Sequence, residues 1–299
     1  MNALRLFFCD QHSFPLPDGH KFPVAKYAMV RNLLAGDRRF ELEEAPLATV
    51  GDLQRVHTEE YVDGFLRGTL QNSVIRRIGF PWSKELVKRT LASAGGTLAT
   101  VQTALQTGCA GTIAGGTHHA FRSEGAGFCV FNDLAVAAEW AKQCAGVSRV
   151  AIVDLDVHQG DGTANIFDAD ERVFTLSLHC RSNFPARKQH SRLDVEFADG
   201  AGAEQYLPAL DEALNEVWRF APELILFQSG VDGLASDRLG RLSLTLEGLA
   251  RRDSIVLKGA KERSIPIAVM MGGGYSDPIG PTVEAHVQTY RLAADVFVR

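Results

Sequence analysis

The segment "VAIVDLDVHQGDGTA" (150–164) places acids and a histidine directly after an apolar run. Asp156 and His158 are separated by one residue, so both side chains can point the same way just past a strand. Carboxylate and imidazole groups bind Zn²⁺ and similar divalent ions. Asp232 follows another apolar run and is the natural third ligand. Three such ligands leave a coordination position open, which is typical of a catalytic metal site.

A second group of residues has the types needed for proton transfer. His118 and His119 follow two glycines, and Asp154 and Asp161 are acids that the metal does not require. A carboxylate that pairs with an imidazole orients the ring and raises its basicity. We therefore expect these four residues to move protons beside the metal. Tyr275 follows three glycines and is either a packing residue or a hydrogen-bond donor to a developing oxyanion.

These residues belong to clusters that follow apolar runs throughout the chain. The carboxyl ends of strands are where an open parallel sheet binds its ligands. Clusters far apart in the sequence are therefore expected to converge on one site. The clusters are "GGTHHAF" (115–121), "DLDVHQGDG" (154–162), "SLH" (177–179), "SGVDGLASDRLG" (229–240) and "GGGY" (272–275).

The elements that must position these clusters alternate between strands and helices. Apolar runs without polar alternation indicate strands buried on both faces, and strand–helix repetition is typical of a doubly wound α/β sheet. The expected strands are 4–9, 111–116, 149–155, 172–178, 223–230 and 265–274. Helices are expected from Ser83 to a stop at Gly108, and from near Asn132, Gly202, Thr245 and Pro281. The opening 80 residues are more irregular, and segments 14–23 and 76–82 are predicted to be loops over one end of the sheet. The chain 1–299 is predicted to be a single domain.

Composition excludes several other classes of protein. The chain of 299 residues is 45% hydrophobic and 22% charged with a formal net charge of -5, as is ordinary for a soluble globular protein. It has no basic stripe, so we expect no nucleic-acid partner. No apolar run reaches the length of a membrane span. Its five cysteines form no CxxC pair, which predicts reduced thiols and a cytoplasmic protein.

Taken together, these motifs resemble the zinc-dependent histone deacetylase family. The segments "GGTHHAF", "GFCVFND", "VDLDVHQGDGT", "SGVDGLASDRLGRLSLT" and "GGGY" occur in the order and spacing of that family, over nearly the whole chain. The resemblance implies an α/β fold with a mostly parallel sheet of eight strands flanked by helices. The segment "SFPLPDGHKFPVAKY" is most similar to class IV members, including bacterial ones. Class IV members often carry Asn where this chain has Asp161, which is more like class I.

The resemblance also implies a role for each matching residue. It implies one Zn²⁺ per chain held by Asp156, His158 and Asp232. His119 matches the general base and acid, and His118 its electrostatic neighbour. The remaining matches are Asp154 and Asp161 as the carboxylate partners of His118 and His119, Tyr275 as the group that polarises the substrate carbonyl, Gly127, Phe128, Phe184, Leu239 and Gly273 as substrate-binding residues, and Asp154 with Ser177 at a monovalent cation site that usually holds K⁺.

The leading hypothesis is therefore a zinc-dependent hydrolase that removes acetyl or longer acyl groups from protein lysines. The alternative is a deacetylase of acetylpolyamines or other small N-acyl amines. An arginase-like enzyme would need ligands for a second metal, but Gly160 and Leu234 occupy the positions where its carboxylates would stand. A catalytically dead binding module is a further alternative, although every expected catalytic position is filled. The sequence gives neither the physiological substrate nor the oligomeric state.

Overall fold

The computed structural model describes residues 3–298, whose eight strands form one sheet. All neighbouring strands pair in parallel, in the order β2-β1-β3-β8-β7-β4-β5-β6. This arrangement confirms the predicted fold class. The strands are β1 (Leu4–Phe8), β2 (Phe40–Glu44), β3 (Cys109–Ile113), β4 (Val150–Asp154), β5 (Val173–Cys180), β6 (Leu193–Phe197), β7 (Leu224–Gln228) and β8 (Ile267–Met270).

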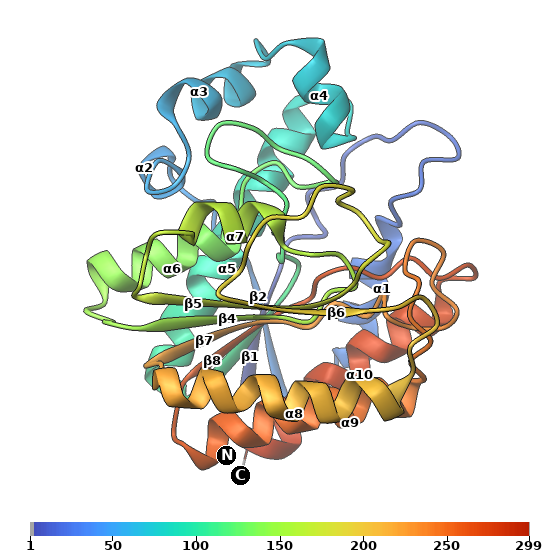
Figure 1. Cartoon of the computed structure of the whole chain (residues 1–299). Helices are drawn as coiled ribbons and strands as arrows, with labels where there is room; N and C mark the ends of the chain where they lie inside the picture. The colour runs from blue at the N-terminus through green and yellow to red at the C-terminus, as the bar shows by residue number, and fades with distance from the viewer. Residues whose placement is uncertain (1–2, 299) are drawn as a thin grey trace.

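Helices cover both faces of the sheet (Figure 1). The central strands are buried along their whole length, which explains their uninterrupted apolar sequences. One face carries α1 (Ala25–Leu34), α8 (Ala203–Phe220), α9 (Leu246–Glu262) and α10 (Gly280–Phe297). The other carries α5 (Lys84–Thr107), α6 (Asp133–Cys144) and α7 (Asp161–Phe167), with α2 (Val50–Leu53), α3 (Glu59–Arg67) and α4 (Asn72–Ile78) beyond them.

The predicted helix boundaries coincide with capping groups. The Ser83 side chain accepts a hydrogen bond from the backbone N–H of Leu86, and α5 ends at Gly108 with a left-handed φ of 89°. Asn132 and Thr245 cap α6 and α9 in the same way as Ser83 caps α5. A side-chain oxygen at such a position satisfies a backbone donor that lacks a partner within the helix. None of the described helices is long and apolar enough to cross a membrane.

The loop predicted at 14–23 is confirmed, whereas the one predicted at 76–82 overlaps the end of α4. The opening 80 residues also contain the edge strand β2 and the helices α1 to α4, which the sequence pattern did not predict. The apolar positions of these short helices are spaced over one or two turns only, which gives little periodic signal. Strand β3 begins at Cys109, before the predicted start at residue 111, and β8 ends at Met270, before the predicted end at residue 274.

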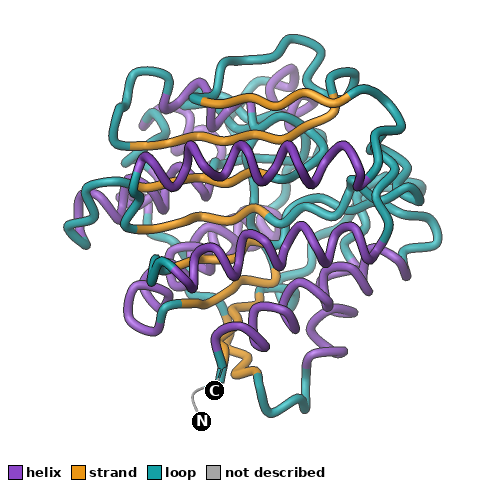
Figure 2. The backbone as a smooth tube through the Cα atoms, turned by 60° about the horizontal axis from the view of Figure 1, so that its bottom comes forward, coloured by secondary structure: helices purple, strands orange, loops and turns teal. Residues whose placement is uncertain are grey.

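The strand order explains how distant motifs meet. Strands β3, β8, β7, β4 and β5 are consecutive neighbours in the sheet, and all of them run in the same direction. The segments that follow them therefore emerge side by side at one edge. Figure 2 shows the strands lying parallel, with loop segments densest at one end of the sheet, to the right in that view. All five motif clusters lie in or next to these segments.

Candidate active site

The three expected metal ligands lie together in the described structure. One ligand atom from each of Asp156, His158 and Asp232 lies within 4.8 Å of the other two. Nδ1 of His158 is 3.0 Å from Oδ1 of Asp156 and 3.1 Å from Oδ2 of Asp232. Asp156 and His158 follow β4, whereas Asp232 follows β7, the neighbouring strand. The sheet therefore assembles the triad from positions 74 residues apart.

Backbone groups hold the two carboxylates in place. The N–H of Gly273 donates to Oδ2 of Asp156 at 2.8 Å, and the N–H of Val157 donates to Oδ1 of Asp232 at 2.9 Å. A Cβ at position 273 would lie 2.1 Å from Oδ2 of Asp232. Only glycine therefore allows the chain to pass so close to the carboxylates. Gly273, expected to bind substrate, lines the inner cavity described below and also orients Asp156.

The charges of the triad suit a divalent cation. Asp156 and Asp232 are both almost completely buried. Burial and the adjacent charge of Asp156 raise the pKa of Asp232 to about 7. Two adjacent buried carboxylates repel one another unless a positive charge lies between them. Oxygen and imidazole nitrogen donors are suited to zinc and related ions. The residues therefore fit the metal that the sequence resemblance implies.

His118 and His119 each pair with a different buried carboxylate. Nδ1 of His118 donates to Oδ2 of Asp154 at 2.6 Å. Nδ1 of His119 donates to Oδ1 of Asp161 at 2.6 Å. The two rings are 4.0 Å apart between centroids. Because each Nδ1 faces an acid, each Nε2 is left for chemistry in the cavity.

The two histidines differ in their electrostatic surroundings. Burial alone would lower the pKa of His118, but Asp154 and Asp156 raise it to about 9. Burial, together with the charge of His118, lowers the pKa of His119 to about 4 despite its bond to Asp161. Adjacent imidazoles with separated pKa values are suited to different roles in proton transfer.

Tyr275 is held beside the triad by an acid and by a buried lysine. Its backbone N–H donates to Oδ2 of Asp237 at 2.6 Å. The ammonium group of Lys26 lies 5.1 Å from the centroid of its ring. Burial and the charges of Asp156 and Asp232 raise the pKa of Tyr275 well above its usual value. Its hydroxyl group therefore stays protonated and can donate a hydrogen bond.

A mouth leads from the surface to the histidines and the metal triad. Phe184 at this mouth is 45% exposed, and its ring packs edge-on against His119 with centroids 4.8 Å apart. A Cβ on Gly127 would lie 2.7 Å from Cδ2 of His119, so a larger residue would press on the ring. The mouth is lined by Lys21, His119, Gly127, Phe128, His158, Ser182, Asn183, Phe184, Leu239, Arg241 and Tyr275. Four of the five expected substrate-binding residues, Gly127, Phe128, Phe184 and Leu239, are therefore brought together.

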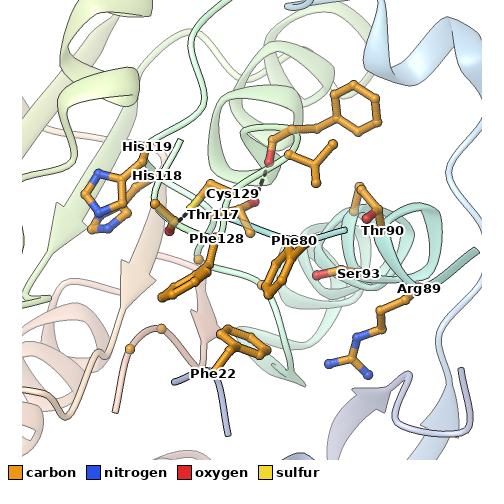
Figure 3. A pocket seen from close by; sticks show the side chains of 18 of the residues that line it. Phe22, Phe80, Arg89, Thr90, Ser93, Thr117, His118, His119, Phe128 and Cys129 are labelled. Carbon is orange, nitrogen blue, oxygen red and sulfur yellow. Dashed lines mark hydrogen bonds between the residues drawn. The ribbon is translucent and has the colours of Figure 1, made fainter. Parts of the chain in front are cut away.

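An inner cavity continues from the same residues into the protein. It is lined by His118, His119, Asp156 and His158 at one end and by aromatic rings beyond them. Figure 3 shows the rings of Phe22, Phe80 and Phe128 grouped in this cavity, with His118 and His119 to one side. The inner cavity is therefore continuous with the space beside the triad of Asp156, His158 and Asp232.

The comparisons with known proteins agree with this geometry. The sequence model of the histone deacetylase domain matches residues 20–290, which include every site residue named above. The chain belongs to the histone deacetylase family. Membership identifies it as a deacetylase, a hydrolase that acts on amides.

Individual members of the family are similar over most of the chain. An uncharacterized protein of Picosynechococcus is 43% identical over 95% of this chain and 96% of its own length. Histone deacetylase 2 of Arabidopsis thaliana is 32% identical over 86% of this chain and 70% of its own. A probable deacetylase of Archaeoglobus fulgidus is 32% identical over 80% of this chain and 70% of its own length. A solved structure of a histone deacetylase homologue complexed with SAHA has a TM-score of 0.83 and 25% identity, and the match covers 98% of this chain and 84% of that one.

Asp154 and Ser177, expected at the monovalent cation site of the family, lie opposite each other on β4 and β5. Oδ1 of Asp154 accepts a hydrogen bond from the backbone N–H of Asp156 at 3.1 Å. The hydroxyl group of Ser177 is 3.0 Å from Nδ1 of His179.

Sequence reasoning missed three residues that support the site. Lys26 donates to the carbonyl oxygens of Gly272 and Gly274, but no local pattern marks it. Asp237 holds Tyr275 and belongs to the motif "SGVDGLASDRLG", where a second acid after Asp232 is a usable signal. Asn183 donates to the carbonyl oxygen of Leu239 at 2.6 Å and lines the mouth.

Proposed function

We propose that this protein is a zinc-dependent lysine deacylase, acting as a single catalytic domain. The observation that carries the proposal is the buried triad of Asp156, His158 and Asp232 beside two histidines, each paired with its own acid. A metal triad next to proton-transfer groups, at the end of an open mouth, is suited to hydrolysis of an amide.

The metal has a defined place and task in this proposal. Asp156, His158 and Asp232 would hold one ion, which when bound supplies Lewis-acid polarisation and lowers the pKa of water to about 7. Zinc is the ion that the sequence resemblance implies. Asp154 and Ser177 are proposed to hold K⁺ behind the triad, where it would add positive charge next to the Asp154–His118 pair.

The histidines are proposed to divide the proton transfers between them. His119 accepts a proton at Nε2 from the attacking water, because its Nδ1 is occupied by Asp161. His118, kept positive by Asp154, stabilises negative charge on the reacting centre. A protonated imidazole then donates to the leaving amine. Tyr275 donates from its hydroxyl group to the oxygen of the amide carbonyl.

The mouth favours acyl-lysine in a polypeptide over a cationic polyamine. Lys21 lines it and forms no ion pair with residues 3–298, so it would repel a second ammonium group, whereas Arg241 pairs with Asp199 at 3.3 Å. A lysine residue presents one neutral amide on an apolar stem, which fits between Phe128 and Phe184. Small N-acyl amines without further positive charge remain the alternative substrates.

Two further features belong to this proposal. The five cysteines are free, which supports a reducing compartment such as the cytoplasm.

The segment 13–27, which carried the likeness to class IV, contributes Phe14, Phe22 and Tyr27 to the inner cavity. We propose class IV membership on that segment, with Asp161 as a departure from the class.

A panel of acylated lysine peptides and acetylpolyamines tests the proposal. We expect the purified, metal-loaded protein to remove the acyl group from the lysine side chain of the peptides, with kcat/KM at least about tenfold above that for acetylpolyamines. The zinc form is compared with protein treated with a chelator. Absence of amide hydrolysis with every peptide and amine, in folded and metal-loaded protein, would refute the proposal.

A further inference from the structure

The mouth and the inner cavity meet at the reacting groups. His119, Gly127, Phe128, His158 and Tyr275 line both spaces. The amide of a substrate must therefore lie at this junction. Because a lysine of a polypeptide enters from the mouth, its acyl group points into the inner cavity. The residues deep in that cavity therefore contact the acyl chain and select it.

The inner cavity is larger than an acetyl group requires. Its volume is about 90 Å³, whereas one water molecule needs only about 10–15 Å³ measured in the same way. The methyl group of an acetyl chain would fill a small part of it. A chain of several carbon atoms would instead extend past the rings of Phe22, Phe80 and Phe128.

The end of the cavity away from the histidines is polar and carries a positive charge. Arg89, Thr90 and Ser93 lie there on α5, opposite His118 and His119 in Figure 3. Arg89 is only 7% exposed, and its guanidinium carbon lies 4.4 Å from the centroid of the Tyr27 ring. A cationic side chain thus lies in a cavity that several Phe and Tyr rings also line.

No acid among residues 3–298 forms an ion pair with Arg89. Two acids elsewhere in the protein have other partners. Oδ2 of Asp10 pairs with Arg31 at 3.0 Å, and Asp133 accepts hydrogen bonds from the hydroxyl group of Thr97 and the backbone N–H of Thr117. A buried guanidinium without a carboxylate is unfavourable, so a ligand that brings one would be stabilised there.

We propose that the inner cavity binds acyl chains that end in a carboxylate, such as succinyl and glutaryl groups, with Arg89 as the residue that recognises the carboxylate. The inference rests on the proposed deacylase function and names its acyl specificity. Hydrolysis breaks the C–N bond of the amide and forms a C–O bond with the oxygen of water. The amine takes a proton, and the products are the polypeptide with an unmodified lysine side chain and a dicarboxylate, so no further reactant is needed.

The first test compares matched substrates with the wild-type, metal-loaded protein. The peptides carry acetyl-lysine, glutaryl-lysine or the carboxamide of glutaryl-lysine, which has the same shape without the charge. We expect kcat/KM for the glutaryl peptide to exceed that for the carboxamide by about 10- to 100-fold, because a hydrogen bond to a charged group is lost in the latter. Equal values, or a preference for the carboxamide, would overturn the proposal.

The second test assigns the effect to one side chain. Arg89→Met should lower the ratio of kcat/KM for glutaryl over carboxamide by at least about tenfold. Arg89→Lys keeps the charge and should retain part of the ratio. Lys88→Met removes a positive charge from the exposed neighbouring position on α5 and should leave the ratio unchanged. A ratio that survives Arg89→Met would show that the arginine is structural.

The outcomes separate this inference from the function on which it rests. Hydrolysis of acetyl-lysine with no preference for glutaryl would overturn the inference and leave the deacylase function intact. Failure with all three peptides would refute the function itself. If Arg89→Met fails to fold, the comparison of the glutaryl peptide with the carboxamide peptide in the wild-type protein still tests whether the cavity prefers a carboxylate.

Discussion

The ammonium group of Lys26 lies 5.1 Å from the centre of the Tyr275 ring and is completely buried. It donates to the carbonyl oxygens of Gly272 at 3.3 Å and Gly274 at 3.2 Å. Burial lowers its pKa to about 8, although the charges of Asp232 and Asp156 oppose that effect. The lysine thus fixes the glycine segment from which Tyr275 projects, and it forms no ion pair with any acid in residues 3–298.

Replacing Lys26 by methionine should therefore affect both stability and turnover. Two buried carbonyl groups would lose their donor, which costs about 1–3 kcal/mol of unfolding free energy for each group left unsatisfied. Misplacement of Tyr275 should lower kcat by about tenfold or more. Lys26→Arg keeps the charge and the donors and should retain most activity. A lower melting temperature with wild-type kcat in Lys26→Met would limit the lysine to a structural role.

Asp161 offers a graded test of the His119 pair. Asp161→Asn keeps an oxygen that can accept from Nδ1 of His119 but removes the negative charge, so we expect kcat to fall by about tenfold. Asp161→Ala removes the acceptor as well and should lower kcat by a factor of about 10²–10⁴. Steady-state kinetics with one acyl-lysine peptide measures both. Equal activity of the two variants would show that Asp161 does not orient the ring.

The central part of this fold could be predicted because its strands are buried on both faces. Strands β3, β4, β5, β7 and β8 have apolar sequences bounded by glycine and polar motifs, and the site residues stand directly after them. Their parallel direction is enough to bring the motifs to one edge. The histidine, acid and tyrosine motifs were therefore visible before their spatial relations were known.

The edges of the sheet and the supporting residues could not be predicted in this way. Strands β2 and β6 read "FELEE" and "LDVEF", and their partly exposed, charged sequences give no buried-strand signal. The total of eight strands came from the family resemblance alone. Lys26 contacts residues 246 and 248 positions away, so no local spacing could reveal its role. The same holds for Arg89, whose surroundings are set by tertiary packing.

The metal content of the wild-type protein and of an Asp232→Ala variant tests the proposed metal site. The wild-type protein should retain about one divalent ion per chain after dialysis, because the triad has ligands for a single ion. Asp232→Ala leaves two ligands and should lower both metal content and activity by at least about tenfold. Asp63→Ala, which removes an acid from a surface pair with Arg67, is the control and should change neither. Two tightly held ions per wild-type chain would contradict the single site.

Tyr275 tests the proposed donor to the oxyanion. Tyr275→Phe removes the hydroxyl group and leaves Asp156, His158 and Asp232 in place, so metal content should not change. Loss of one such donor costs roughly 10²–10³ in kcat, or about 2.7–4 kcal/mol. KM should change much less than kcat, because an interaction made mainly in the transition state appears in kcat. If Tyr275 served only in packing, the Tyr275→Phe variant would instead be less stable and would keep its kcat per folded molecule. The measurement is kcat together with metal content and melting temperature, and wild-type turnover in Tyr275→Phe would remove this residue from the mechanism.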